Sequence, residues 1–313
     1  MTSMTFVVLV AARWVQFLSG MILLGTSLFP FYALPSKMSA DTMQVAQSVR
    51  RALAVAALAS AASALAWVAA SIVNIAGDVG GLIDRETLSD YFFETSFGKV
   101  WALRLVLASM LMALVLLARR RLFARNGATG LVAVLASALL VSQAWIGHPA
   151  SLTGSERWVV TAAYAIHMLG AGVWLGALLP IGLLLARARR SGEAGRTAEF
   201  ALRRFSPVGM IAVSSILVGG VINVISRAGS FDAFVTSTWG QIVLIKIAII
   251  SAMIVVAALN RFVLMPLLST AQPEIALARL ARNVTFEQVA GLLILTAAAI
   301  LGVFHPPHFH LPH

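Results

Sequence analysis

Eight apolar runs of about 20 residues follow one another along the 313-residue chain, and they constrain its fold more than any other feature. An α-helix needs a run of about this length to cross the hydrocarbon core of a bilayer. Only 11% of the residues are charged, whereas a soluble domain carries roughly a quarter. We therefore predict an all-α, polytopic membrane protein with eight transmembrane helices and no soluble domain. The predicted spans are residues 6–32, 52–76, 98–118, 129–147, 158–186, 206–227, 239–260 and 284–304.

The basic residues gather in every second loop, and this alternation predicts the orientation of the chain. The formal net charge is +11, but short arginine clusters between apolar runs are typical of a topology signal rather than of nucleic-acid binding. The basic loops should be cytoplasmic, which places both termini in the periplasm of a Gram-negative cell. No nucleotide-binding or hydrolase motif is present, so we expect neither nucleotide binding nor enzymatic activity. The basic loops contain Lys37, Arg50 and Arg51; Arg119, Arg120, Arg121 and Arg125; Arg187, Arg189, Arg190, Arg196, Arg203 and Arg204; and Arg261, Arg279 and Arg282.

A weak internal repeat divides the chain into two halves. The tripeptides at 96–98 and 238–240 both end in glycine, and each is followed six residues later by a cation, Arg104 or Lys246. Two further pairs occupy matching places, Asn74 with Asn223 and His148 with His305. We predict two parallel four-helix repeats, residues 1–150 and 157–306, followed by a His-rich tail at 307–313. Parallel repeats often build transporters with a site between the halves.

Histidines are the best candidates for metal ligands, because cysteine is absent and imidazole is a common ligand for copper, zinc, iron and nickel. All six lie in the predicted outer half of the protein: His148, His167, His305, His308, His310 and His313. His167 lies nine residues into the fifth span, on the order of 14 Å below the outer surface. The others have simpler alternative interpretations. His148 precedes a proline and could end a helix, and the tail could be a disordered weak metal binder.

Other polar residues in the spans leave alternatives open. Met168 follows His167 and could bind Cu(I), although a single methionine in a span is usually a packing residue. Arg13, Arg104 and Lys246 could reach the interface, pair structurally or anchor an anionic group. Glu287 is predicted at the cytoplasmic start of the eighth span, where it would favour the helix dipole or serve a proton or ion relay.

An ordered set of motifs covers nearly the whole chain and resembles the CopD family (copper resistance D domain) of bacterial copper resistance and homeostasis membrane proteins. The resemblance implies an inner-membrane protein that takes copper from a separate periplasmic CopC-like partner and moves it to the cytoplasm. It does not fix which residues bind copper. The matching segments are Arg13-Trp14 through Pro30, Gly147-His148-Pro149, His167 to Gly176, Ser206-Pro207 with Asn223, Thr238-Trp239-Gly240 with Lys246, Asn260-Arg261, Glu287 with Gly291, and the His-rich tail.

A haem-binding membrane redox protein of the b-type cytochrome kind is the alternative interpretation. Four-helix membrane units with histidines also build such cytochromes, and Arg104 or Lys246 could meet haem propionates. Against this alternative, only His167 is well inside a span, so His148 would have to reach it for bis-His ligation. A Soret band in the visible spectrum would favour haem, and its absence would favour copper.

Overall fold

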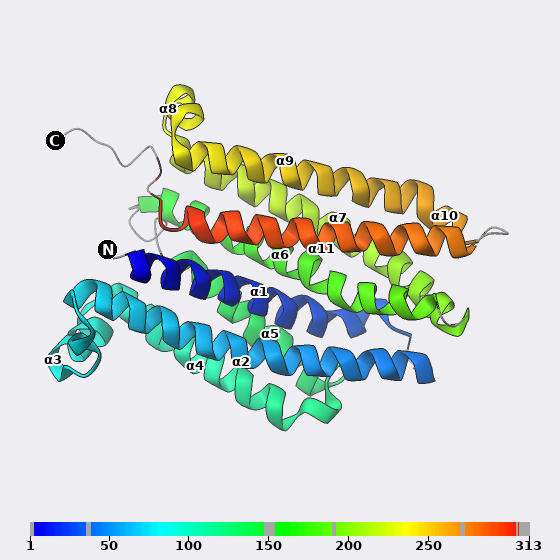
Figure 1. Cartoon of the computed structure of the whole chain (residues 1–313), viewed down its shortest axis with the longest axis horizontal. Helices are drawn as coiled ribbons and strands as arrows, with labels where there is room; N and C mark the ends of the chain where they lie inside the picture. Colours follow the sequence, from blue (N-terminus) through cyan, green and yellow to red (C-terminus); the bar gives the residue numbers. More distant parts are fainter. Residues whose placement is uncertain are drawn as a thin grey trace.

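The computed structural model describes residues 3–35, 39–146, 154–189, 192–269, 273–304 and residue 306, and in these ranges all regular structure is helical (Figure 1). Eight of the described helices are long and apolar enough to cross a membrane, which confirms the predicted number of spans. These are α1 (Ser3–Ala33), α2 (Ala40–Ala76), α4 (Ser96–Leu117), α5 (Gly127–Val141, continued by the 3-10 turn η4, Ser142–Trp145), α6 (Gly154–Ala188), α7 (Gly192–Ala228), α9 (Thr238–Leu259, continued by the π-helical η6, Asn260–Leu264, and α10, Met265–Leu267) and α11 (Pro273–Leu301).

Three helices begin well before the predicted spans. Helices α2, α7 and α11 start at Ala40, Gly192 and Pro273 rather than at residues 52, 206 and 284. Helix α7 has 37 residues, about 55 Å at 1.5 Å per residue, whereas the hydrocarbon core is about 30 Å thick. The additional turns at these helix starts contain polar residues. A hydropathy pattern does not count such residues as part of a span, although they continue the helix.

All three extensions lie at the end of the bundle with the arginine clusters, the predicted cytoplasmic end. Several of these arginines hold helix ends together. Arg125 donates to the carbonyls of Pro30 (2.9 Å) and Leu34 (2.5 Å), which the end of α1 leaves without intrahelical partners. Arg187 of α6 pairs with Asp41 of α2 at 2.7 Å.

Helices α1 and α6 form the centre of the bundle. Figure 1 shows α2 and α4 on one side of this pair and α7 and α9 on the other. The central pair packs closely because glycines meet where the helices cross: a Cβ added at Gly25 would fall 2.4 Å from the carbonyl oxygen of Gly172 and 2.7 Å from the Cα of Gly176. Thr26 donates to the carbonyl of Gly176 at 3.0 Å. Small residues that let backbones approach are typical of membrane helix contacts.

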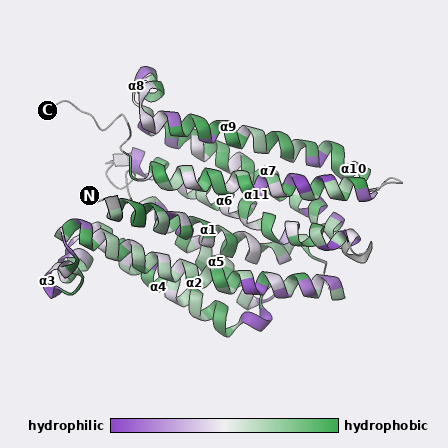
Figure 2. Ribbon diagram, viewed as in Figure 1, coloured by the Kyte–Doolittle hydropathy of each residue, from purple (hydrophilic) through white to green (hydrophobic). Residues whose placement is uncertain are grey.

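The predicted periplasmic end holds the start of α1, the end of α11 and the short helices α3 (Arg85–Ser89) and α8 (Phe231–Thr236) (Figure 1). Figure 2 shows mostly hydrophobic helices between more polar ends. Further short segments are η1 (Val79–Leu82), η2 (Asp90–Glu94) and η3 (Arg119–Arg121). Asp84 caps α3, and hydrogen bonds from Thr87 hold the pKa of this exposed carboxyl below its usual value.

The starts of α4 and α9 have the same local structure, a hydroxyl cap followed by a closely packed glycine. Thr95 accepts a hydrogen bond from Gly98 N at 2.8 Å, and Ser237 accepts one from Gly240 N at 3.1 Å. A Cβ at either glycine would fall 1.7 Å from a carbonyl oxygen of the preceding short helix, so only glycine fits. The superposition of the two predicted halves, 1–150 and 157–306, stays a prediction.

Candidate functional site

His167 is the one predicted metal ligand that lies within the described residues. His148, His305, His308, His310 and His313 lie outside them, so their predicted role as ligands stays a prediction. Among the residues that the structure does describe, no three His, Asp or Glu side chains lie together as a metal site. The site is therefore built outward from His167.

The His167 ring lies in the contact between α6 and α7. Its Nδ1 is 2.8 Å from the carbonyl oxygen of Ile216. A carbonyl can only accept, so Nδ1 carries the proton and donates, and in the neutral ring Nε2 keeps the lone pair that binds metal. The same arrangement orients metal-binding histidines in general, where the second nitrogen donates to a carbonyl or carboxylate. The ring is thus fixed with a potential ligand atom available.

Two adjacent glycines of α7 make room for this ring. A Cβ at Gly219 would fall 2.4 Å from the carbonyl oxygen of Ala163 and 2.9 Å from the Cβ of His167. At Gly220 the nearest atoms would be His167 Nδ1 and Cε1, at 3.4 and 3.5 Å. Gly219 therefore sets the distance between the helices, and Gly220 borders the ring.

Met168 belongs to the hydrophobic core and is only 5% exposed. Consecutive residues on an α-helix point about 100° apart, so Met168 and His167 face different neighbours. The packing interpretation of Met168 accounts for this position without a metal.

Two cations on α7 and α9 act electrostatically on His167. The charges of Lys246 on α9 and Arg227 on α7 both act on the His167 ring. Arg227 lies 5.9 Å from the ring centroid of Tyr164, one turn before His167 on α6. Sequence reasoning missed Arg227 and Tyr164 because each lies near the edge of an apolar run, where a polar residue is ordinary.

Two further cations, Arg13 and Arg104, lie in the same half of the bundle, and the charge of Arg13 acts on Arg104. Arg104 has no exposed surface. It donates to the carbonyl of Leu139 at 3.1 Å and to Ser142 Oγ at 2.6 Å. These bonds hold Arg104 in the packing between α4 and the end of α5, which fits the alternative that it pairs structurally.

Arg13 crosses from α1 to the end of α11. Its guanidinium lies 4.7 Å from the ring centroid of Trp67, and a Cβ at Gly302 would fall 1.0 Å from its Nη1. The position at 302 therefore has to be glycine for Arg13 to take this path. The two described ion pairs, Arg187 with Asp41 and Arg203 with Glu199, do not involve any of these cations.

Glu287 forms a separate polar network in the middle of α11. Its carboxylate accepts a hydrogen bond from Asn260 Nδ2 at 2.9 Å, and Asn283 donates to Asn260 Oδ1 at 2.7 Å. Helix α11 begins at Pro273, so Glu287 lies 14 residues, or about 21 Å, into it. The interpretation of Glu287 as a residue of the first turn is wrong, because the dipole effect falls off within that turn. A proton or ion relay stays a prediction.

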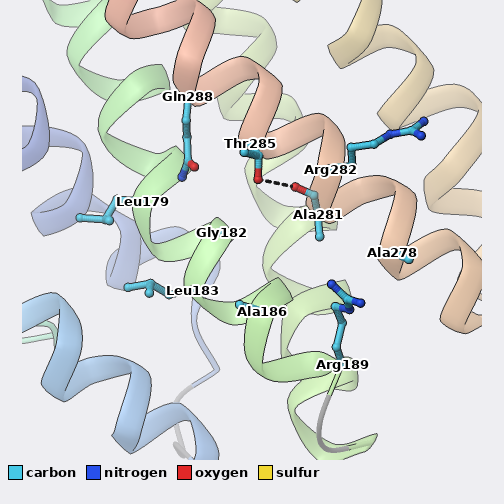
Figure 3. A pocket seen from close by; sticks show the side chains of 10 residues that line it. All are labelled: Leu179, Gly182, Leu183, Ala186, Arg189, Ala278, Ala281, Arg282, Thr285 and Gln288. Carbon is cyan, nitrogen blue, oxygen red and sulfur yellow. Dashed lines mark hydrogen bonds between the residues drawn. The ribbon is translucent and has the colours of Figure 1, made fainter.

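A pocket of about 480 Å³ lies between α6 and α11 at the predicted cytoplasmic end (Figure 3). Arg189 and Arg282 line it together with Gln288, which donates to the carbonyl of Leu178 at 2.9 Å. Among the described residues that line it, there is no histidine or carboxylate. It lies about 22 Å along α6 from His167, from residue 167 to Gly182, so the two regions are separate.

Comparison with known proteins gives consistent matches along the chain. Residues 1–158 match the family described as "Copper resistance protein D-like, N-terminal domain", and residues 198–301 match "Copper resistance protein D". The inner membrane protein YebZ of Escherichia coli (strain K12) is 29% identical over 265 residues, which are 82% of this chain and 84% of YebZ. Copper resistance protein D of Pseudomonas syringae pv. tomato is 30% identical over 219 residues, which are 68% of this chain and 70% of that protein.

A more distant similarity extends to a larger protein. The copper transport protein CutJ of Bacillus subtilis (strain 168) is 26% identical over 235 residues, which are 75% of this chain and 41% of CutJ. No solved structure matches the chain. Two of the three relatives are named for copper, so the comparisons favour the copper interpretation over the b-type cytochrome alternative.

Proposed function

This chain belongs to the copper resistance protein D family, and we propose that it takes copper from the periplasm and moves it through the membrane to the cytoplasm. In this proposal copper is cargo, and the protein has no enzymatic activity. Both termini lie in the periplasm, and a separate CopC-like protein delivers the metal. The alternation of basic loops supports the orientation.

The single observation that carries the proposal is the fixed ring of His167. The Ile216 carbonyl holds the proton on Nδ1, which leaves Nε2 to bind copper without any change of ring orientation. An intramembrane station should bind modestly, because conduction requires that an ion also leave. One imidazole with no second described ligand fits that requirement better than a closed cage does.

The remaining histidines complete the proposed path at its outer mouth. His148 and His305 end the fourth and eighth predicted spans, and His308, His310 and His313 follow as a capture arm. Prolines between the tail histidines disfavour regular structure. Because protonated imidazole cannot bind metal, uptake through this path should fall as the pH drops through about 6.

The test is copper accumulation in cells that express His167→Ala. We expect this variant to lose most uptake, and a chain ending at Phe304 or the His148→Ala variant to lose part of it, mainly at low copper. Met168→Leu is the matched control, because it replaces the next side chain at similar volume and should keep uptake near the parent level. Amount and membrane insertion of each variant are checked by immunoblot of membrane fractions.

Two results would count against the proposal. If His167→Ala accumulates copper like the parent, His167 is a packing residue and no intramembrane station exists there. If deletion of the whole protein leaves cellular copper unchanged at every external concentration, inward transport itself is wrong.

A further inference from the structure

Four cations converge on the predicted periplasmic half of the bundle, and no described carboxylate pairs with any of them. The charge of Arg13 acts on Arg104. Their guanidinium groups lie over the rings of Trp67 and Trp101, and the centroids of these two rings are 5.0 Å apart. The charge of Arg227 acts on Lys246 in the same way, so the four charges form two neighbouring pairs. They come from the four helices α1, α4, α7 and α9. We call Arg13, Arg104, Arg227 and Lys246 the cation cluster.

Two members of the cation cluster have buried donors without partners. Nε and Nη2 of Arg104 and Nη1 of Arg13 are buried, and no hydrogen-bond partner meets them among the described residues. The bonds of Arg104 to Leu139 and Ser142 use only Nη1. Arg104 lies about 12 Å and Arg13 about 15 Å beyond the first residue of its helix, so these donors are well inside the membrane-spanning part.

An uncompensated group of this kind is costly. A charge removed from water is expensive unless it is paired and hydrogen-bonded, and arginine stays protonated at neutral pH. The indole rings of Trp67 and Trp101 face the two guanidinium groups at 4.7 and 4.8 Å. Cation–π contacts offset part of the cost, but they give no hydrogen-bond acceptor to the unpartnered N–H donors of Arg13 and Arg104.

We propose that the cation cluster binds an oxyanion, specifically a phosphate group, between Arg13 and Arg104. The forked N–H donors of guanidinium match the oxygen geometry of phosphate. Arg227 and Lys246 have no buried donor without a partner among the described residues, and they contribute positive charge that attracts the anion. Phosphate is the chemistry shared by two sources at this end, the free anion of the periplasm and the headgroup of an outer-leaflet phospholipid.

This site goes beyond copper transport and does not depend on it. It also bears on the proposed function, because Lys246 and Arg227 act on His167 and would repel a copper ion there. A bound anion would reduce that repulsion. Anion binding is therefore measured without copper, so that failure of one proposal does not decide the other.

The first experiment measures the unfolding temperature of the purified, delipidated protein in a non-ionic detergent during titration with inorganic phosphate. Ionic strength is held constant with chloride. A ligand that binds the folded state raises this temperature in a saturable manner. We expect Arg104→Gln and, independently, Arg13→Gln to raise the half-saturating phosphate concentration about tenfold or more, equivalent to about 1.4 kcal/mol. Lys99→Gln is the matched control, because it removes one positive charge from the exposed surface of the same helix, α4.

The second experiment identifies the source. The parent and the variants are reconstituted in vesicles of phosphatidylethanolamine and phosphatidylglycerol, re-extracted and delipidated, and the phosphorus retained per chain is measured. If free phosphate has no effect but about one phospholipid is retained by the parent and by Lys99→Gln and lost in both arginine variants, the ligand is a headgroup. If neither probe binds saturably, or if Arg104→Gln and Arg13→Gln behave like Lys99→Gln, the proposal is wrong.

Discussion

Two adjacent glycines should respond in opposite ways to the same substitution, and the reason lies in the contact of α6 with α7. Alanine at 219 would place its Cβ 2.4 Å from the carbonyl oxygen of Ala163, which is backbone and cannot rotate away. Alanine at 220 would meet only the edge of the His167 ring, at 3.4 and 3.5 Å. Both changes give α7 the same gain in helix propensity, so the comparison isolates the distance between the helices.

The size of the effect follows from the distances. To move from 2.4 Å to the 3.0 Å that real contacts need, the helices must separate by at least 0.6 Å. The His167–Ile216 hydrogen bond, now 2.8 Å, would then stretch to about 3.4 Å, beyond the usual range. Overpacking costs about 1–3 kcal/mol and the lost bond about 1 kcal/mol, against about 1 kcal/mol gained in helix propensity. Gly219→Ala should therefore destabilise the protein by about 1–3 kcal/mol, and Gly220→Ala should be neutral or stabilise it by up to about 1 kcal/mol.

Thermal unfolding of the two purified variants in one detergent gives the stability difference, and copper accumulation gives the functional one. Gly219→Ala should lose uptake because the ring is no longer held with its proton on Nδ1, while Gly220→Ala should retain it. Equal stability and equal uptake in the two variants would refute both the close approach of α6 and α7 and its role in orienting His167.

The remaining predictions concern packing and orientation. Gly25→Ala should destabilise the protein by about 1–3 kcal/mol in thermal unfolding, because its Cβ would meet the backbone of α6; Gly130→Ala, whose Cβ would lie 3.7 Å from Phe31, should not. Reporter fusions after Arg125 and after Gly192 should read cytoplasmic, and a fusion after Pro306 should read periplasmic. A cytoplasmic C-terminus would reverse the end of the membrane to which every histidine is assigned.

The number of spans could be predicted because each depends only on a local apolar run. The helix ends could not, because α2, α7 and α11 extend beyond their apolar runs with polar residues that hydropathy does not count. Ser39, for example, accepts a hydrogen bond from Thr42 N at 3.3 Å and starts α2 twelve residues before the predicted span. Glu287 was misplaced for the same reason: the predicted start of α11 at residue 284 is too late, so Glu287 was assigned to the first turn instead of the middle of the helix.

The candidate site was only partly accessible from the sequence. His167, Arg104 and Lys246 stand out because polar residues inside apolar runs are costly. Their convergence depends on how helices far apart in the chain pack, and the Ile216 carbonyl that fixes the ring is 49 residues from His167. The paired glycines at 219 and 220 were the available signal, because they indicate a surface on which another helix can approach closely.

The π-helical segment at Asn260–Leu264 has a consequence for how members of this family can differ in length. A π turn holds one residue more than an α turn and behaves as a one-residue insertion. Upstream of it α9 faces mostly outward, whereas within it Asn260 turns inward to reach Glu287. A single helical wheel drawn through residue 260 would therefore assign one of these surfaces wrongly. A relative one residue shorter here could close the π turn into an α turn and keep both surfaces, so a gap at this point would signify no change of topology.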